Sequence, residues 1–289
     1  METLNHFEIA GGSVTGTRHI KRGSNNQDYY SFVRTDEYIV AIVSDGCGSC
    51  LHSEVGSKIQ TEVVLQSLAT HYVTHVQELG EDCILYPKFW KEVEESALHS
   101  IKTLAMQMGD DLRSTIARYF LATCIGVLIT KKYTQLFSCG DGVYMLNGKQ
   151  WNIGPFEGNM PPYFAYAITG SSITDTNPEL LGLRRNELLK TEEIHSLLLG
   201  TDGVEDLIKK SDSLFPGQEK NIGTISQFWE NDAYFQNPQL ITNTLRMMNT
   251  EKKIPQWKDE NILKFEGILP DDTTLITIRR KELYENSNH

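Results

Sequence analysis

Two long segments with helical periodicity follow one another in this 289-residue chain, and short apolar segments lie on both sides of them. Apolar residues recur every three or four positions in Ser53–Leu79 and again in Lys88–Phe120. Runs rich in β-branched and aromatic residues predict strands over His6–Val14, Tyr29–Arg34, Tyr38–Ser44, Ala122–Thr130, Thr134–Cys139, Val143–Leu146, Ser196–Gly200 and Thr274–Ile278. Parallel βαβ units need strands and helices that alternate, and these do not. The order therefore predicts an α+β domain with layered antiparallel sheets.

The composition excludes two classes of protein. The chain carries 27 Lys and Arg against 38 Asp and Glu, which gives a formal charge of −11. Binding to nucleic-acid phosphates or to anionic lipid needs clustered Lys and Arg. No apolar run approaches the ~20 residues that span a bilayer. We therefore expect a protein that binds neither nucleic acid nor membrane.

The first residues and the cysteines bear on the compartment. Met1–His6 lacks the basic and apolar regions of a secretory signal. The five cysteines are odd in number and irregularly spaced, which favours reduced thiols over a disulfide framework. A cytoplasmic location is expected.

No internal repeat and no Gly/Ser-rich or Pro-rich linker divides the chain, so a single domain over residues 1–289 is expected. Residues 155–190 are richer in Pro, Gly and Asn, and residues 205–261 are polar with scattered aromatic side chains. Both read as segments inserted between strands, and we interpret the second as a variable flap. The aromatic side chains expected to form a local core in it are Phe228, Trp229, Tyr234, Phe235 and Trp257.

Acidic residues stand at the ends of several predicted strands. Three strands run into Asp-Gly, at Asp45, Asp141 and Asp202, while Asp28 and the pair Asp271-Asp272 immediately precede two others. Asp-Gly is common in tight turns, but the chain enters predicted helices after Asp45 and Asp202. Carboxylates that converge there would repel one another unless a divalent cation neutralised them. Ligands that are all oxygen favour Mg²⁺ or Mn²⁺ over Zn²⁺.

Taken in order, these motifs resemble those of a known family. They are residues 16–28 (GTRHIKRGSNNQD), Ser44-Asp45-Gly46, the strand that begins near Thr123, Gly140-Asp141-Gly142, residues 199–203 (LGTDG) and residues 271–274 (DDTT). Their order and spacing are similar to those of the metal-dependent PP2C-type serine/threonine phosphatases. The resemblance covers about residues 9–279 and is greatest to the short, divergent bacterial members.

The resemblance implies a fold, a reaction and a set of site residues. The fold is a four-layer sandwich of two central antiparallel sheets flanked by helices. The reaction is hydrolysis of phosphoserine or phosphothreonine by a hydroxide that bridges two divalent cations, Mn²⁺ or Mg²⁺. Asp45 would bridge the two metals, and Asp141 would hold a third, looser one. The implied metal-binding and catalytic residues are Asp28, Asp45, the carbonyl of Gly46, Asp202 and Asp271.

The sequence departs from the family pattern in four places. Gln27 replaces a glutamate and removes one formal charge from the second metal site, and Asp272 replaces an asparagine. Cys47 stands where animal members have a histidine proposed as general acid, a role that His19 or metal-bound water could take. The phosphate-binding arginine has two candidates, Arg18 and Arg22.

Two further functions stay open at this level. A catalytically weak pseudophosphatase could bind a phosphoprotein or a kinase. Cys47-Gly48-Ser49-Cys50 follows a strand and precedes a helix, as in thiol redox proteins, although neither an aromatic residue before Cys47 nor a βαβ pattern is present. His71 and His75 have the i, i+4 spacing of a helical zinc pair, but no third ligand is evident, and we interpret them as surface or packing residues.

The leading hypothesis is a bacterial, cytoplasmic serine/threonine protein phosphatase that acts in signalling. Its candidate partners are phosphorylated protein substrates and a cognate serine/threonine kinase.

Overall fold

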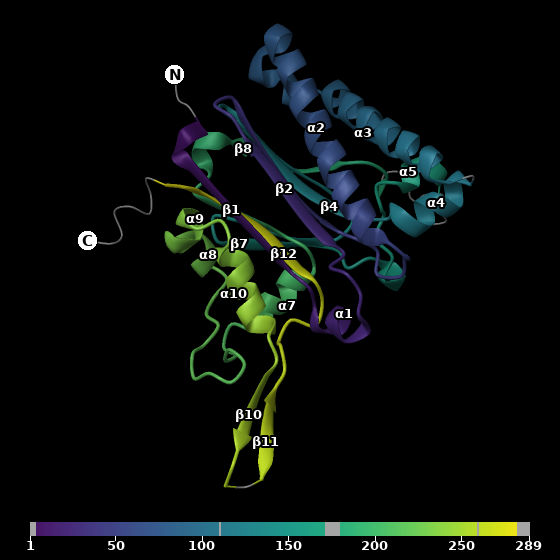
Figure 1. The fold of residues 1–289 in the computed structure, drawn as a ribbon. Helices are drawn as coiled ribbons and strands as arrows, with labels where there is room; N and C mark the ends of the chain where they lie inside the picture. The colour runs from purple at the N-terminus through teal and green to yellow at the C-terminus, as the bar shows by residue number, and fades with distance from the viewer. Residues whose placement is uncertain (1–3, 110, 171–179, 259, 282–289) are drawn as a thin grey trace.

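Two five-stranded antiparallel sheets lie at the centre of the molecule (Figure 1). The computed structural model describes residues 4–109, 111–170, 180–258 and 260–281. The first sheet has the order β1 (Phe7–Val14), β12 (Thr273–Arg280), β9 (Ser196–Gly200), β6 (Gly142–Leu146), β7 (Lys149–Ile153). The second has the order β2 (Asp28–Arg34), β3 (Tyr38–Asp45), β4 (Cys124–Thr130), β5 (Tyr133–Cys139), β8 (Arg184–Lys190).

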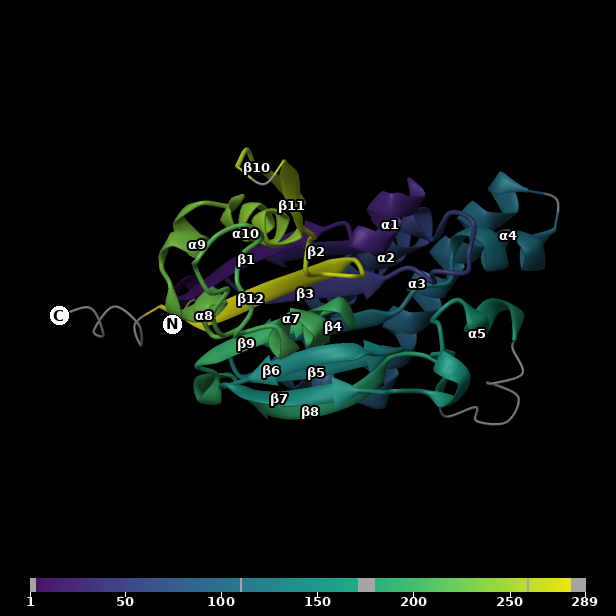
Figure 2. The ribbon, with the colours of Figure 1, turned by 90° about the horizontal axis from the view of Figure 1, so that it is seen from below.

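Helices cover the outer faces of both sheets (Figures 1 and 2). The second sheet carries α2 (Ser53–Leu79), α3 (Pro87–Met108), α4 (Leu112–Tyr119) and the short α5 (Tyr166–Thr169). The first carries α7 (Gly203–Lys209), α8 (Gln227–Glu230), α9 (Ala233–Gln236) and α10 (Leu240–Asn249). The short α1 (Thr17–Arg22) links β1 to β2. The prediction of a four-layer α+β sandwich is confirmed.

The remaining elements are small. A hairpin of β10 (Lys252–Gln256) and β11 (Asn261–Phe265) projects from the body of the molecule (Figure 1). In the described part of the chain, 3₁₀ helices cover Leu4–His6, Gly80–Leu85, Glu157–Asn159 and Thr191–Glu193. Among the described residues, no helix combines the length and the apolar character needed to cross a bilayer.

Strand β3 shows why the sandwich forms. Successive side chains of a strand point to opposite faces, and every residue of Ile39–Val43 is buried. Ile39, Ala41 and Val43 pack in the core between the two sheets. Val40 and Ile42 pack against the layer of α2 and α3. A strand covered on both faces needs a continuous apolar run, and that run is visible in the sequence.

The secondary-structure predictions need correction at one helix and four strands. The segment expected as one helix over Lys88–Phe120 is two helices, because the chain leaves helical geometry at Gly109 and restarts with Asp111, whose side chain accepts a hydrogen bond from Ser114 N at 3.0 Å. Strands β7, β8, β10 and β11 were not predicted. The first two lie at sheet edges and the other two form a hairpin; most of their residues are exposed, so their hydrophobic pattern is weak.

The aromatic residues of the segment 205–261 divide into two groups. Phe228, Trp229 and Tyr234 are buried between the first sheet and its covering helices, and Phe235 packs against the same core. Trp257 is 87% exposed in the projecting hairpin, so its assignment to a local core is wrong.

Candidate active site

The strand ends bring the predicted acidic residues to one edge of the sandwich. Asp28 begins β2 and Asp45 ends β3, and the two residues lie directly opposite each other in the ladder. In the other sheet, Asp271 precedes β12, and Asp202 follows the end of the neighbouring β9. Asp141 lies in the turn between β5 and β6. Five segments that are distant in sequence therefore supply carboxylates to one region.

Two adjoining cavities of about 390 Å³ and about 280 Å³ open at this edge. The residues that line both of them are Arg18, Asp141, Asp202 and Asp271. The smaller cavity is also lined by Asp45, Gly46 and Arg22. Asp28 does not line either cavity but is buried next to Asp45. The structure thus brings together all the site residues expected from the sequence.

Asp28 is a buried carboxylate whose two oxygens differ in their hydrogen bonding. Its Oδ2 accepts a hydrogen bond from the hydroxyl of Thr201 at 2.7 Å. Its Oδ1 is buried and has no hydrogen-bond partner within the described part of the chain. Burial and the neighbouring charge of Asp272 raise the pKa of Asp28 to about 8. An ionised Asp28 therefore needs a positive charge beside Oδ1, which a divalent cation would provide.

The pKa values of Asp45, Asp202 and Asp141 are raised as well. Burial, followed by the charges of Asp28 and Asp202, raises the pKa of Asp45 well above its usual range. Asp202 is exposed to the solvent in the cavity, yet partial desolvation and its neighbours Asp271 and Asp141 raise its pKa to about 7. Desolvation raises the pKa of Asp141 as well. A cluster of this kind, with oxygen donors alone, fits hard divalent cations such as Mg²⁺ or Mn²⁺.

The backbone around Asp45 is held by hydrogen bonds that leave its carboxylate available. Asp45 N donates to the hydroxyl of Thr123 at 3.0 Å, and Thr123 N donates to the Asp45 carbonyl at 2.7 Å. The next residue, Gly46, donates from its N–H to the carbonyl of Gln27 at 3.1 Å. A Cβ on Gly46 would lie 2.8 Å from that carbonyl and 2.8 Å from Ser53, so no larger residue fits.

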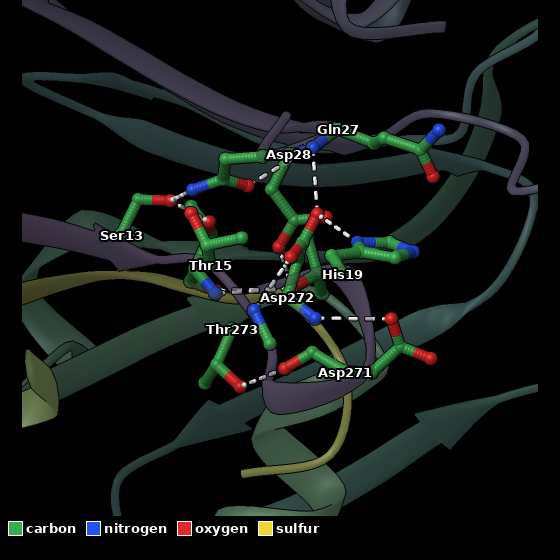
Figure 3. Close-up of polar contacts among 12 residues, drawn as sticks. Ser13, Thr15, His19, Gln27, Asp28, Asp271, Asp272 and Thr273 are labelled. Atoms are coloured by element: carbon green, nitrogen blue, oxygen red, sulfur yellow. Dashed lines mark hydrogen bonds and ion pairs between the residues drawn. The ribbon is translucent and has the colours of Figure 1, made fainter. Parts of the chain in front are cut away.

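Asp272 has a larger role than its sequence suggested (Figure 3). It is 3% exposed, and its two oxygens accept hydrogen bonds from Gly16 N at 2.7 Å and from Gln27 N at 2.6 Å. The ring nitrogen Nδ1 of His19 lies 2.9 Å from the same Oδ2. The family's asparagine has only one acceptor oxygen. Asp272 therefore ties the loop before β2 to β12, and its departure from the family residue was the signal that could have revealed this.

Four basic side chains reach the cavities. Arg18 lines both, Arg22 and His19 line the smaller one, and Lys209 of α7 lines the larger one. Lys209 could not be predicted from the sequence, because it lies on a helix with no recognisable motif. A phosphate group in either cavity can therefore contact Arg18.

Cys47 also lines the smaller cavity, with its sulfur 3.2 Å from the hydroxyl of Ser49. The neighbouring Cys50 thiol lowers the pKa of Cys47 to about 5. Both cysteines are free thiols. However, β3 pairs antiparallel with both β2 and β4, so the βαβ surroundings of a thioredoxin-like site are not found here.

An antiparallel sandwich with a carboxylate-lined cleft at one edge is the architecture that the PP2C resemblance implied. A sequence model of the family described as protein phosphatase 2C matches residues 15–239. The chain therefore belongs to the protein phosphatase 2C family. No curated protein matches it by sequence.

Solved structures share the fold at low sequence identity. The serine/threonine phosphatase Stp1 from Staphylococcus aureus is 16% identical, with a TM-score of 0.53 over 96% of this chain and 97% of that one. Serine-threonine phosphatase 2C from Toxoplasma gondii is 13% identical, with a TM-score of 0.54 over 94% of both chains. A sex-determining protein of C. elegans is 11% identical, with a TM-score of 0.53 over 98% of this chain and 68% of that one.

Proposed function

We propose that this protein is a divalent-metal-dependent phosphatase that hydrolyses phosphoserine and phosphothreonine in proteins. The observation that carries the proposal is the convergence of Asp28, Asp45, Asp202 and Asp271 at one strand edge. The raised pKa values of Asp28, Asp45 and Asp202 are the electrostatic signature of a cation site. Membership of the protein phosphatase 2C family connects this site with phosphoryl chemistry.

The donor set fits two Mn²⁺ or Mg²⁺ ions. Asp45 would be shared by the two ions, because it is close enough to both Asp28 and Asp202 for their charges to raise its pKa. The Gly46 carbonyl and Asp271 would complete the ligands, and Asp141 would hold a third, looser ion. When bound, such ions lower the pKa of a water nucleophile and neutralise the phosphoryl oxygens.

The chain's own residues would hold the substrate and its leaving group. Arg18 lines both cavities and is the stronger candidate for the phosphate; Arg22 lines only one. A guanidinium suits phosphate because it donates two parallel hydrogen bonds. His19 is the one imidazole among the described residues that line the smaller cavity. Its contact with Asp272 would orient the ring for proton donation to the leaving alkoxide.

A pseudophosphatase that binds phosphoproteins without hydrolysing them is the second candidate. Gln27 favours it, because a buried neutral amide stands where the family has a glutamate. Under either function, the proposed partners are phosphorylated proteins and a cognate serine/threonine kinase, in the cytoplasm of a bacterium.

The decisive experiment measures hydrolysis of p-nitrophenyl phosphate and of phosphoserine and phosphothreonine peptides with Mn²⁺, with Mg²⁺ and with EDTA. We expect turnover with either metal and none with EDTA. The Asp45→Asn variant should lose this turnover. Its matched control is Asp36→Asn, because Asp36 is exposed in the turn at the opposite end of the β2–β3 hairpin. Peptide binding without hydrolysis at any metal concentration would establish the pseudophosphatase instead.

A further inference from the structure

A second cluster of metal-ligating side chains lies between α2 and α3. His71 and His75 stand one turn apart on α2, and the structure places Glu92 of α3 against them. Glu92 Oε2 lies 2.6 Å from His75 Nε2 and 3.8 Å from His71 Nδ1. The sequence showed the histidine pair but no third ligand, because Glu92 comes from the following helix.

These three side chains form a compact, accessible site. Their ligand atoms all lie within 4.8 Å of one another. The side chains are 24%, 14% and 30% exposed for His71, His75 and Glu92, so an ion can reach them from solvent. The edge of the buried Phe89 packs against the His75 ring, with the ring centres 5.9 Å apart, and restricts its orientation.

We propose that His71, His75 and Glu92 bind a Zn²⁺ ion, with water as the fourth ligand. Two imidazole nitrogens and one carboxylate oxygen are an established zinc donor set. Neighbouring ligands around tetrahedral zinc lie about 3.3 Å apart, and the distances of 2.6 and 3.8 Å to Glu92 bracket that value. Small rotations of these partly exposed side chains would therefore complete the geometry.

This site and the carboxylate cleft favour different metals. Imidazole nitrogens favour Zn²⁺ strongly over Mn²⁺ and Mg²⁺, which prefer oxygen ligands. Two local features oppose the cation. A hydrogen bond of 2.6 Å joins His75 Nε2 and Glu92 Oε2 and would be replaced by the metal, and Lys88 Nζ lies 3.7 Å from Glu92 Oε1. Lys88 is 79% exposed at its side chain and can turn away into solvent. Its removal should therefore tighten zinc binding.

The zinc site is remote from the cleft. Helix α2 begins at Ser53, shortly after Asp45, and His71 lies 18 residues further along, about 27 Å at 1.5 Å per residue. An ion there would link α2 to α3, the two long helices of the layer that covers the second sheet. Its effect is therefore on the stability of this helical layer, and the proposal is independent of phosphatase activity.

The test is equilibrium dialysis of the full chain against about 10 µM Zn²⁺, in an Asp45→Asn, Asp202→Asn background that weakens the cleft. We expect one bound zinc per chain in this background. His71→Asn, His75→Asn and Glu92→Gln should each weaken binding at least tenfold. His99→Ala is the matched control, because His99 is exposed elsewhere on α3, and it should bind zinc unchanged.

Thermal unfolding of the native chain provides a second readout. Zn²⁺ should raise the melting temperature. The Glu92→Gln variant, after circular dichroism has verified its fold, should lose that increase. Lys88→Ala should lower the zinc concentration needed. The proposal is overturned if the three ligand variants bind zinc like their parent, if His99→Ala loses as much binding as they do, or if the parent binds none.

Discussion

Asp28 and Asp45 lie directly opposite each other in the β2–β3 ladder, one at the first and one at the last position of its strand. Like charges at opposed positions destabilise a sheet, and both of these residues have raised pKa values in the metal-free protein. This pair therefore destabilises the metal-free fold, and the same two carboxylates attract cations strongly.

Asp45→Asn should separate activity from stability. We expect Mn²⁺-dependent turnover to fall by at least two orders of magnitude, because the shared charge between two cations is lost. In EDTA the same variant should melt at a higher temperature than the native chain, because it relieves repulsion with Asp28. Asp202→Asn should behave in the same way. Near-full activity in both variants would show that the metal assignment is wrong.

The metal-free protein should lose stability as the pH rises. Burial raises the pKa of Asp28 from 3.8 to about 8 in the folded state, so between these values the folded chain holds a proton that the unfolded chain releases. Stability is then fully present below the unfolded pKa and declines toward pH 8. Thermal unfolding in EDTA from pH 5.5 to 8.5 measures this slope, and Asp28→Asn should reduce it. A slope that does not change in the variant would assign the effect to other groups.

Gln27→Glu should strengthen metal activation. Gln27 is 8% exposed and lines the smaller cavity, and a carboxylate there adds charge for the second cation. In the native chain, activity should rise with Mn²⁺ well past one equivalent, with half-saturation at about 10⁻⁴ to 10⁻³ M. The variant should shift that titration to lower concentration, whereas Gln66→Glu, an exposed change on α2, should not. Stoichiometric saturation in the native chain would contradict a weak site and would direct attention to Asp141.

The thiols beside Asp45 should be dispensable for hydrolysis. Cys47→Ser combined with Cys50→Ser should keep substantial phosphatase activity under reducing conditions, because neither sulfur belongs to the proposed oxygen ligands. Activity of each protein is compared at saturating Mn²⁺. Complete loss of turnover while the metals stay bound would mean that the thiols take part in the reaction.

Asp272→Asn should loosen the connection between β1 and β2, in which helix α1 carries Arg18 and His19. An amide has one acceptor oxygen, so one of the buried N–H groups of Gly16 and Gln27 would lose its partner. The expected cost is about 1 to 3 kcal/mol in the free energy of unfolding, measured by urea titration. The control is the same change at the neighbouring position, Asp271→Asn, which should reduce activity but have a smaller effect on the free energy of unfolding. Equal stability of the native chain and the Asp272 variant would contradict the role assigned to Asp272.

Much of the fold could be predicted from local sequence patterns. The eight predicted strands are all present, because strands buried on both faces, such as β3, require apolar runs that can be read residue by residue. Strands β7, β8, β10 and β11 escaped prediction because most of their residues are exposed and need no such run. The break between α3 and α4 escaped because helical periodicity continues across Gly109.

The amino-acid sequence by itself determined which residues end each strand, and hence that Asp28, Asp45, Asp202 and Asp271 stand at strand ends. Only the tertiary structure decided what each carboxylate faces. Asp272 accepts hydrogen bonds from residues 256 and 245 positions away, and Glu92 reaches His75 from a neighbouring helix. The physical reason is that periodicity and turn chemistry act over a few residues, whereas the partner of a buried charge depends on how whole sheets and helices pack.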